Sequence, residues 1–183
     1  MKPAQLTLLV QRFIKDPQKY SGVEPEKVKI QKDLDFCKAF FGYEEIKHTY
    51  IMDLLNDSIC TNNELELDLL LILLTHFHCV KHYCVTLAPL LIQPWHHLHD
   101  RIAGMLEFES DERIIEYLYQ GSIYRCENLE YESDYCEFNR KCLFALAKIG
   151  THKAITYVKT VSTCENTIIA KHALTIIKEY SFA

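Results

Sequence analysis

Residues 139–155 read NRKCLFALAKIGTHKAI, which is the pattern of two amphipathic helices joined by a tight turn. The apolar positions at helical spacing are Leu143 and Leu146 before the turn, and Ile155 and Val158 after it. Gly150 separates the two runs and predicts the turn. We therefore expect a helical hairpin here.

The same pattern occurs forty residues earlier in the chain. Four pairs of positions match: Ala103 with Leu143, Leu106 with Leu146, Ile115 with Ile155, and Leu118 with Val158. The first helix of a third hairpin is predicted around Ile169, Ala173 and Ile176. A single hairpin of two short helices cannot bury its apolar face alone, so we expect the hairpins to stack on one another.

This passage resembles the HEAT repeat, a helix–turn–helix unit of roughly 40 residues. The resemblance covers about residues 82–180, and Ser110 replaces the expected glycine in the earlier copy. The matching positions are Arg140, Leu143, Ala145, Leu146, Ile149, Gly150, Ala154 and Ile155. The resemblance implies an all-α fold that forms a curved α-solenoid within a single domain (residues 1–183). Residues 61–183 would form the hairpins, and residues 1–60 irregular N-terminal helices.

The remaining sequence predicts further helices. We expect them at residues 4–15, 34–41 and 43–55, with a loop over residues 16–33. Asn63 is a candidate N-cap for a helix that is apolar on every side from Leu69 to Leu74, and such a helix must be covered all round. Pro94 is expected to open another helix, which ends near Phe108.

Composition and charge restrict the class of protein. Of 183 residues, 49% are hydrophobic and 25% are charged, values that exclude a disordered chain. The net charge of -5 argues against direct binding of nucleic acid and mildly favours a basic protein partner. The longest apolar run is too short to cross a membrane, and the opening residues are a poor export signal. We expect a cytoplasmic protein whose eight cysteines are free thiols.

Histidines and cysteines gather between residues 76 and 99. His78 and His82 lie one helical turn apart and share the ligand types of a zinc site, but no paired zinc spacing is present. We therefore assign no metal and no cofactor. The chain also lacks a nucleophile elbow and a glycine-rich phosphate loop, so we predict no catalytic residues and no enzyme.

The segment CENLEYESDYCEF, residues 126–138, combines acids with tyrosines and contains no base. Insertions in helical repeats often lie on the binding face, where carboxylates meet a basic partner and tyrosines supply rigid contact area. The candidate partner-binding residues are Glu127, Glu130, Tyr131, Glu132, Asp134, Tyr135 and Glu137. A solvated acidic loop explains the segment equally well. The acids at residues 107–112 have a simpler explanation, with Asp111 as an N-cap.

Small acidic proteins of this kind are similar to the immunity proteins that neutralise toxin domains in bacterial contact-dependent growth inhibition. This similarity implies a protein that binds a basic toxin, such as a nuclease, and covers its active site. The alternatives are a HEAT-like scaffold or adaptor for another protein, a metal-binding regulator, and a nucleic-acid-modifying protein of the DNA-glycosylase type. The last requires a basic concave face, which the net charge disfavours.

Overall fold

A computed structural model describes residues 26–42, 45–125 and 132–181 of the chain. Within these ranges every regular element is an α-helix or a 3-10 helix and none is a strand, so the prediction of an all-α protein is confirmed. The described residues fall into two compact units, with the boundary after Leu73, and each unit is treated by itself. The single domain and the solenoid remain predictions.

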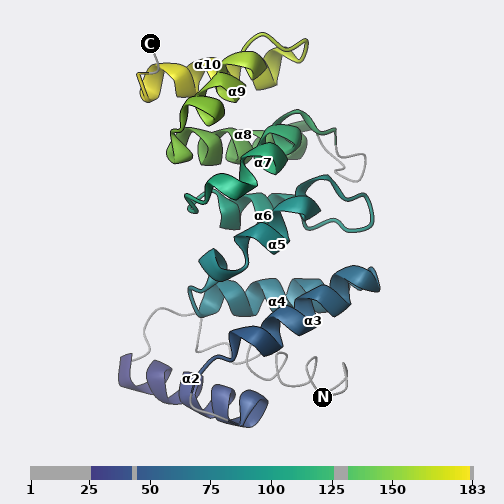
Figure 1. The fold of residues 1–183 in the computed structure, drawn as a ribbon, viewed down its shortest axis with the longest axis vertical. Coiled ribbons are helices and arrows are strands. Elements are labelled where there is room, and N and C mark those ends of the chain that lie inside the picture. Colours follow the sequence, from purple (N-terminus) through teal and green to yellow (C-terminus); the bar gives the residue numbers. More distant parts are fainter. Residues whose placement is uncertain (1–25, 43–44, 126–131, 182–183) are drawn as a thin grey trace. The chain divides into compact units, whose positions relative to one another are not determined.

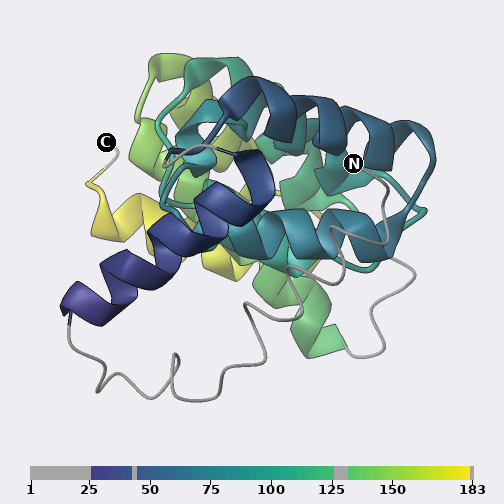
Figure 2. The same cartoon turned by 90° about the horizontal axis from the view of Figure 1, so that it is seen from below.

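The first unit contains α2 (Glu26–Phe41), α3 (His48–Cys60) and most of α4 (Glu64–His76). Figure 2 shows α2 in purple. Aromatic side chains join the first two helices, since the rings of Phe40 and Tyr50 are 5.7 Å apart. Gly42 follows α2 with a φ of +72°, a conformation that glycine adopts without strain, so the predicted break at this residue is confirmed.

The start of α4 confirms the predicted cap. Asn63 Oδ1 accepts a hydrogen bond from the Glu66 backbone N–H at 3.2 Å, while Glu66 Oε2 accepts one from Asn63 Nδ2 at 3.1 Å. Five of the six apolar residues from Leu69 to Leu74 are buried, as expected for a helix that is apolar all round. Glu66 is also buried, and this burial raises the pKa of its carboxyl group.

The second unit is a series of short and long helices that follow one another in Figure 1. Its elements are η2 (Val80–His82), α5 (Cys84–Leu87), η3 (Ala88–Ile92), α6 (His99–Leu106), η4 (Glu112–Ile114), α7 (Ile115–Ile123), α8 (Glu132–Ile149), α9 (His152–Val161) and α10 (Thr167–Glu179). Helix α8 packs against α6 on one side and α10 on the other. Helix α7 packs against η3, α8 and α9.

The turn between α8 and α9 lies where the sequence pattern predicts it. Gly150 has a φ of +68°, and its N–H donates to the Leu146 carbonyl at 3.1 Å. Thr151 then caps α9, because its Oγ1 accepts a hydrogen bond from the Ala154 N–H at 3.3 Å. The predicted hairpin of residues 139–155 is therefore present.

Four helix starts differ from the sequence predictions, and one of them is α3, which begins at His48 rather than at residue 43. Helix α2 begins at Glu26, inside the expected loop of residues 16–33, and α6 begins at His99 rather than at Pro94. Helix α8 begins at Glu132, inside the segment interpreted as a connecting insertion. The starts of α2 and α8 carry many polar residues, so the apolar periodicity that indicates a helix is weak there.

The cysteines mostly serve as small core residues. All seven in the described ranges are free thiols, as expected. Cys37, Cys79, Cys84, Cys136 and Cys142 are buried, whereas Cys60 at the end of α3 is exposed. Burial raises the pKa of the Cys79 thiol to about 11, so this side chain stays protonated and packs as a hydrophobic group.

Candidate partner-binding surface

The acidic segment of residues 126–138 divides into two parts. Glu127, Glu130 and Tyr131 lie outside the described residues. Glu132, Asp134 and Tyr135 belong to the first turn of α8, although the structure describes only their backbone. Acidic residues in a first turn are favoured by the helix dipole, so their sequence position also has a structural reason.

Glu137 is the one candidate of this segment whose side chain is described. It is half-buried and receives a hydrogen bond from Arg140 Nε at 2.7 Å, one helical turn further along α8. The Arg140 guanidinium holds the pKa of the Glu137 carboxyl below its usual range. Glu137 therefore stays ionised, with its charge balanced within the helix.

Buried residues explain why α8 extends so far towards its N-terminus. Cys136 and Asn139 continue the buried face of Cys142 and Leu143 at helical spacing, a sequence signal that the prediction of a connecting insertion overlooked. Asn139 is fully buried, and its Nδ2 donates to the Gly121 carbonyl at 2.8 Å and the Tyr124 carbonyl at 3.2 Å. It thus satisfies carbonyl groups at the end of α7 and fixes α8 to that end.

Two histidines of the residues 76–99 stretch are buried and bind the backbone. His96 Nδ1 accepts from the Leu98 N–H at 3.1 Å, and His96 Nε2 lies 3.1 Å from the Leu90 carbonyl. His99 Nε2 lies 2.8 Å from the Gln93 carbonyl. In the described part of the chain, no three His, Cys, Asp or Glu side chains are placed to hold a metal ion. These contacts give His96 and His99 a structural role in the segment before α6.

Two tyrosines form a stacked pair where α7 meets α9. The rings of Tyr119 and Tyr157 are 4.1 Å apart and 13° from parallel, and both residues are half-buried. Tyr157 Oη donates to Glu116 at 2.9 Å, and Glu116 also pairs with Lys153. Lys153 and then Tyr157 lower the pKa of Glu116. We call these four residues the tyrosine face; their side chains hold one another in fixed positions.

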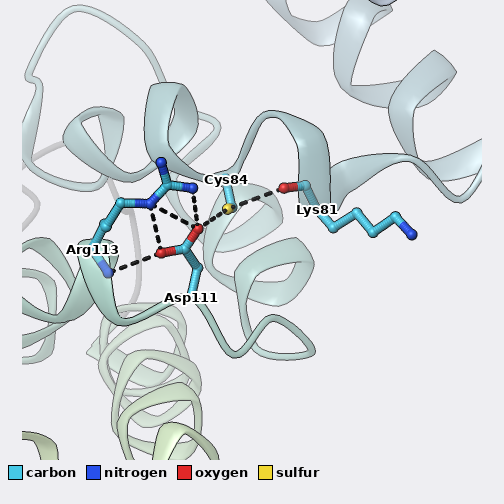
Figure 3. A network of polar contacts seen from close by, with 4 residues as sticks. All are labelled: Lys81, Cys84, Asp111 and Arg113. Carbon is cyan, nitrogen blue, oxygen red and sulfur yellow. Dashed lines mark hydrogen bonds and ion pairs between the residues drawn. The ribbon is translucent and has the colours of Figure 1, made fainter.

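The acidic turn between α6 and α7 is organised by Asp111. Figure 3 shows its carboxylate receiving the Arg113 side chain, with the Arg113 Nη2 to Asp111 Oδ2 distance at 2.6 Å. The Arg113 backbone N–H also donates to Asp111 Oδ1 at 2.9 Å, so the predicted N-cap is confirmed. The Arg113 side chain is the main cause that lowers the pKa of Asp111 to about 2. Cys84 Sγ, which lies 3.6 Å from Asp111 Oδ2, connects this turn to α5.

One large apolar side chain of that turn faces solvent. Phe108 is 71% exposed, although its carbonyl accepts a hydrogen bond from Lys148 Nζ at 2.8 Å. The same ammonium group lies 5.1 Å from the centre of the Phe108 ring. Lys148 therefore anchors the turn to the end of α8 while leaving most of the aromatic ring accessible.

The chain matches no known family model, no curated protein and no solved structure. Among the helices of the described residues, none combines the length and the apolar character that a membrane span requires.

Proposed function

We propose that this chain is a protein-binding module, and specifically an immunity protein that neutralises a basic toxin domain such as a nuclease by covering its active site. The proposal rests on the tyrosine face together with the acidic segment that follows α7. It assigns the chain no catalytic step of its own.

The observation that carries the proposal is the stacked pair of Tyr119 and Tyr157. Tyrosines are enriched among the residues that dominate binding energy, because they offer a large contact area and lose little conformational entropy. Here stacking and the Glu116 contact already fix both rings, so binding would cost little further ordering. A preorganised aromatic pair is a suitable anchor for a protein partner.

Acidic residues follow α7 along the sequence. Helix α7 carries Tyr119 and then the exposed Ile123 near its end, and the chain continues into the acidic residues 127–137. A binding surface that combines tyrosines with acids would complement a basic cleft of the kind that binds phosphate groups. The charge supplies orientation and speed of association, and the tyrosines supply contact area.

The packing of the second unit supports the interpretation of its helices as stacked HEAT-like hairpins. Helix α8 contacts α6 and α10, while α7 contacts α9, so alternate helices are neighbours. That alternation is expected when hairpins stack in sequence order. In such a stack α7 and α9 would be successive second helices, and the tyrosine face would lie on the surface that these helices share.

The first test is to isolate the tagged chain from its native host and to identify any protein that co-purifies at equal stoichiometry. We expect a basic toxin domain that is inactive in the complex and active once released. A partner that keeps full activity in the complex would rule out neutralisation.

The second test locates the interface with matched variants. Replacing Glu130, Glu132 and Asp134 by lysine should weaken partner binding at least about tenfold, because the charge complementarity is reversed. The control reverses three exposed acids elsewhere, Glu112, Glu165 and Glu179, and changes the net charge equally. Equal loss of affinity in both variants would mean that only the total charge matters and would remove the segment from the interface.

An adaptor for another protein is the second candidate. Lys153 lies beside Glu116 in the tyrosine face, so that face carries both signs of charge. A partner bound mainly through the two tyrosines would show little dependence on salt. Under this alternative Tyr119→Ala abolishes binding, whereas the triple lysine variant leaves it unchanged.

A further inference from the structure

The chain distributes its charge very unevenly. Residues 48–80, which include α3 and α4, contain five acids and neither lysine nor arginine. Residues 148–181, which include α9 and α10, contain five lysines and two acids. The net charge of -5 is therefore the sum over segments that differ in sign, of which one is strongly acidic and one is basic.

The basic segment exposes apolar side chains on α10. Ile169, Ala173 and Ile176 point into the unit and are buried, whereas Leu174 is 46% exposed and Ile177 is half-buried. Helix α10 is the yellow helix labelled in Figure 1, and it packs against α8 and α9 through its buried side. Its second apolar stripe thus lies away from the core of the unit.

Lysines border this stripe. Lys171 and Lys178 are exposed and lie two turns apart on α10, next to the position of Leu174. A surface that combines an apolar stripe with lysines fits a partner surface that combines an apolar stripe with acids. We call Lys171, Leu174, Ile177 and Lys178 the basic stripe.

The acidic segment of the same chain has that complementary chemistry. Leu65 on α4 is 61% exposed, and the half-buried Asp68 and Ile72 follow it at helical spacing. On α3, Asp53 and Asp57 are exposed one turn apart, and Asp57 is near enough to Glu66 to raise the pKa of that carboxyl. We call Asp53, Asp57, Leu65, Asp68 and Ile72 the acidic stripe.

We propose that the basic stripe of one copy binds the acidic stripe of a second copy, head to tail. The two contacting surfaces are different, so the interface is heterologous, and each bound copy still presents one surface of each kind. Association therefore proceeds either to closed rings or to open chains of molecules. It weakens as salt rises, because salt screens the attraction between exposed opposite charges, with a screening length of about 10 Å at roughly 0.1 M salt.

The test uses two charge-reversed forms of the full chain in analytical ultracentrifugation. K171E/K178E reverses the basic stripe, and D53K/D57K reverses the acidic stripe. Wild-type protein should sediment faster as its concentration rises, whereas each variant alone should remain monomeric over the same range. An equal mixture of the two variants should regain association, because both opposite-charge pairings become available again.

Apolar contact is tested separately from charge. Leu174→Ser should weaken self-association at least about tenfold, while Val85→Ser, at an apolar residue of α5 that is 38% exposed, should leave it unchanged. Circular dichroism checks that every variant keeps the helical content of the wild type. A wild-type chain that stays monomeric at all concentrations overturns the proposal, as does a dimer that neither charge reversal affects.

Discussion

At the scale of single residues, Asp111 shows how one side chain can hold a turn in place. Its carboxylate caps η4 and is held by Arg113, so Asp111→Ala removes a cap and an ion pair together. We expect the free energy of unfolding at neutral pH to fall by about 1 kcal/mol. Urea denaturation measures this change. Glu112→Ala is the control, since its side chain is exposed and does not cap the turn.

The same residue predicts a dependence on pH. The pKa of Asp111 falls from 3.8 to about 2 on folding, so the unfolded chain binds the proton more tightly. The stabilising contribution is therefore complete above pH 3.8 and is lost as the pH falls towards 2. The stability difference between wild type and Asp111→Ala should shrink over this range. A difference that stays constant down to pH 2 would contradict this assignment.

His96 and His97 are neighbours with different structural environments. His96 is fully buried with both ring nitrogens on backbone groups, whereas His97 is exposed. His96→Leu should cost about 2 kcal/mol of unfolding free energy, because a buried carbonyl and a partly buried N–H group lose their partner. His97→Leu should change it by less than about 0.5 kcal/mol. Thermal unfolding of both variants without added metal distinguishes this role from zinc binding.

Residue-scale predictions from sequence were reliable where the signal is local. Asn63 and Asp111 cap the helix starts at which we placed them, because a cap depends on the next three residues alone. The backbone role of His96 could not be predicted in this way. Its partner Leu90 lies six residues away across a proline-containing bend, and only the folded chain brings the two together.

At the scale of elements, the contact between α7 and α8 depends on Gly121. A Cβ atom there would lie 3.0 Å from Cys142 Sγ and 3.4 Å from Leu91 Cβ. Gly121→Ala should therefore lower the free energy of unfolding by about 1–3 kcal/mol through overpacking. Gly104→Ala is the matched control on α6, where the nearest atom would be a Lys141 side-chain atom at 3.8 Å. It should raise stability by about 0.5–1 kcal/mol.

The sequence predicted the existence of the helices better than their ends. The hairpin at Gly150 was found because apolar periodicity and a turn signal agree there. The start of α8 was missed because its first turn is acidic and aromatic, and only Cys136 and Asn139 continue the buried face. The start of α6 was placed too early, because Pro94 suits a first helical turn but is followed by residues held in a bend by His96.

At the scale of the whole molecule, the net charge of -5 predicts how the proposed toxin would bind. Opposite charges accelerate encounter and act over distances that salt screens. We expect the association rate constant to fall steeply between about 0.05 and 0.5 M salt, with a smaller change in the dissociation rate. Stopped-flow measurements with the purified partner test this. A rate constant that does not respond to salt would favour the adaptor alternative.

Composition favours helices, since five glycines and five prolines leave little room for repeated turns, and the all-helical chain was predicted from apolar periodicity. It could not locate the tyrosine face. Tyr119 and Tyr157 are 38 positions apart and have no special neighbours in the sequence, so only the packing of α7 on α9 brings the rings together. Sites built by packing between distant helices have no local signature from which to predict them.

Among the cysteines that the structure describes, one position is accessible to selective chemistry. Among the described cysteines five are buried, Cys164 is half-buried and Cys60 is exposed at the end of α3. A maleimide dye should therefore attach to Cys60 faster than to the buried thiols, which are protected by their packing. The wild-type chain thus carries an attachment point beside the acidic stripe. Energy transfer between differently labelled copies would report their approach without an engineered cysteine.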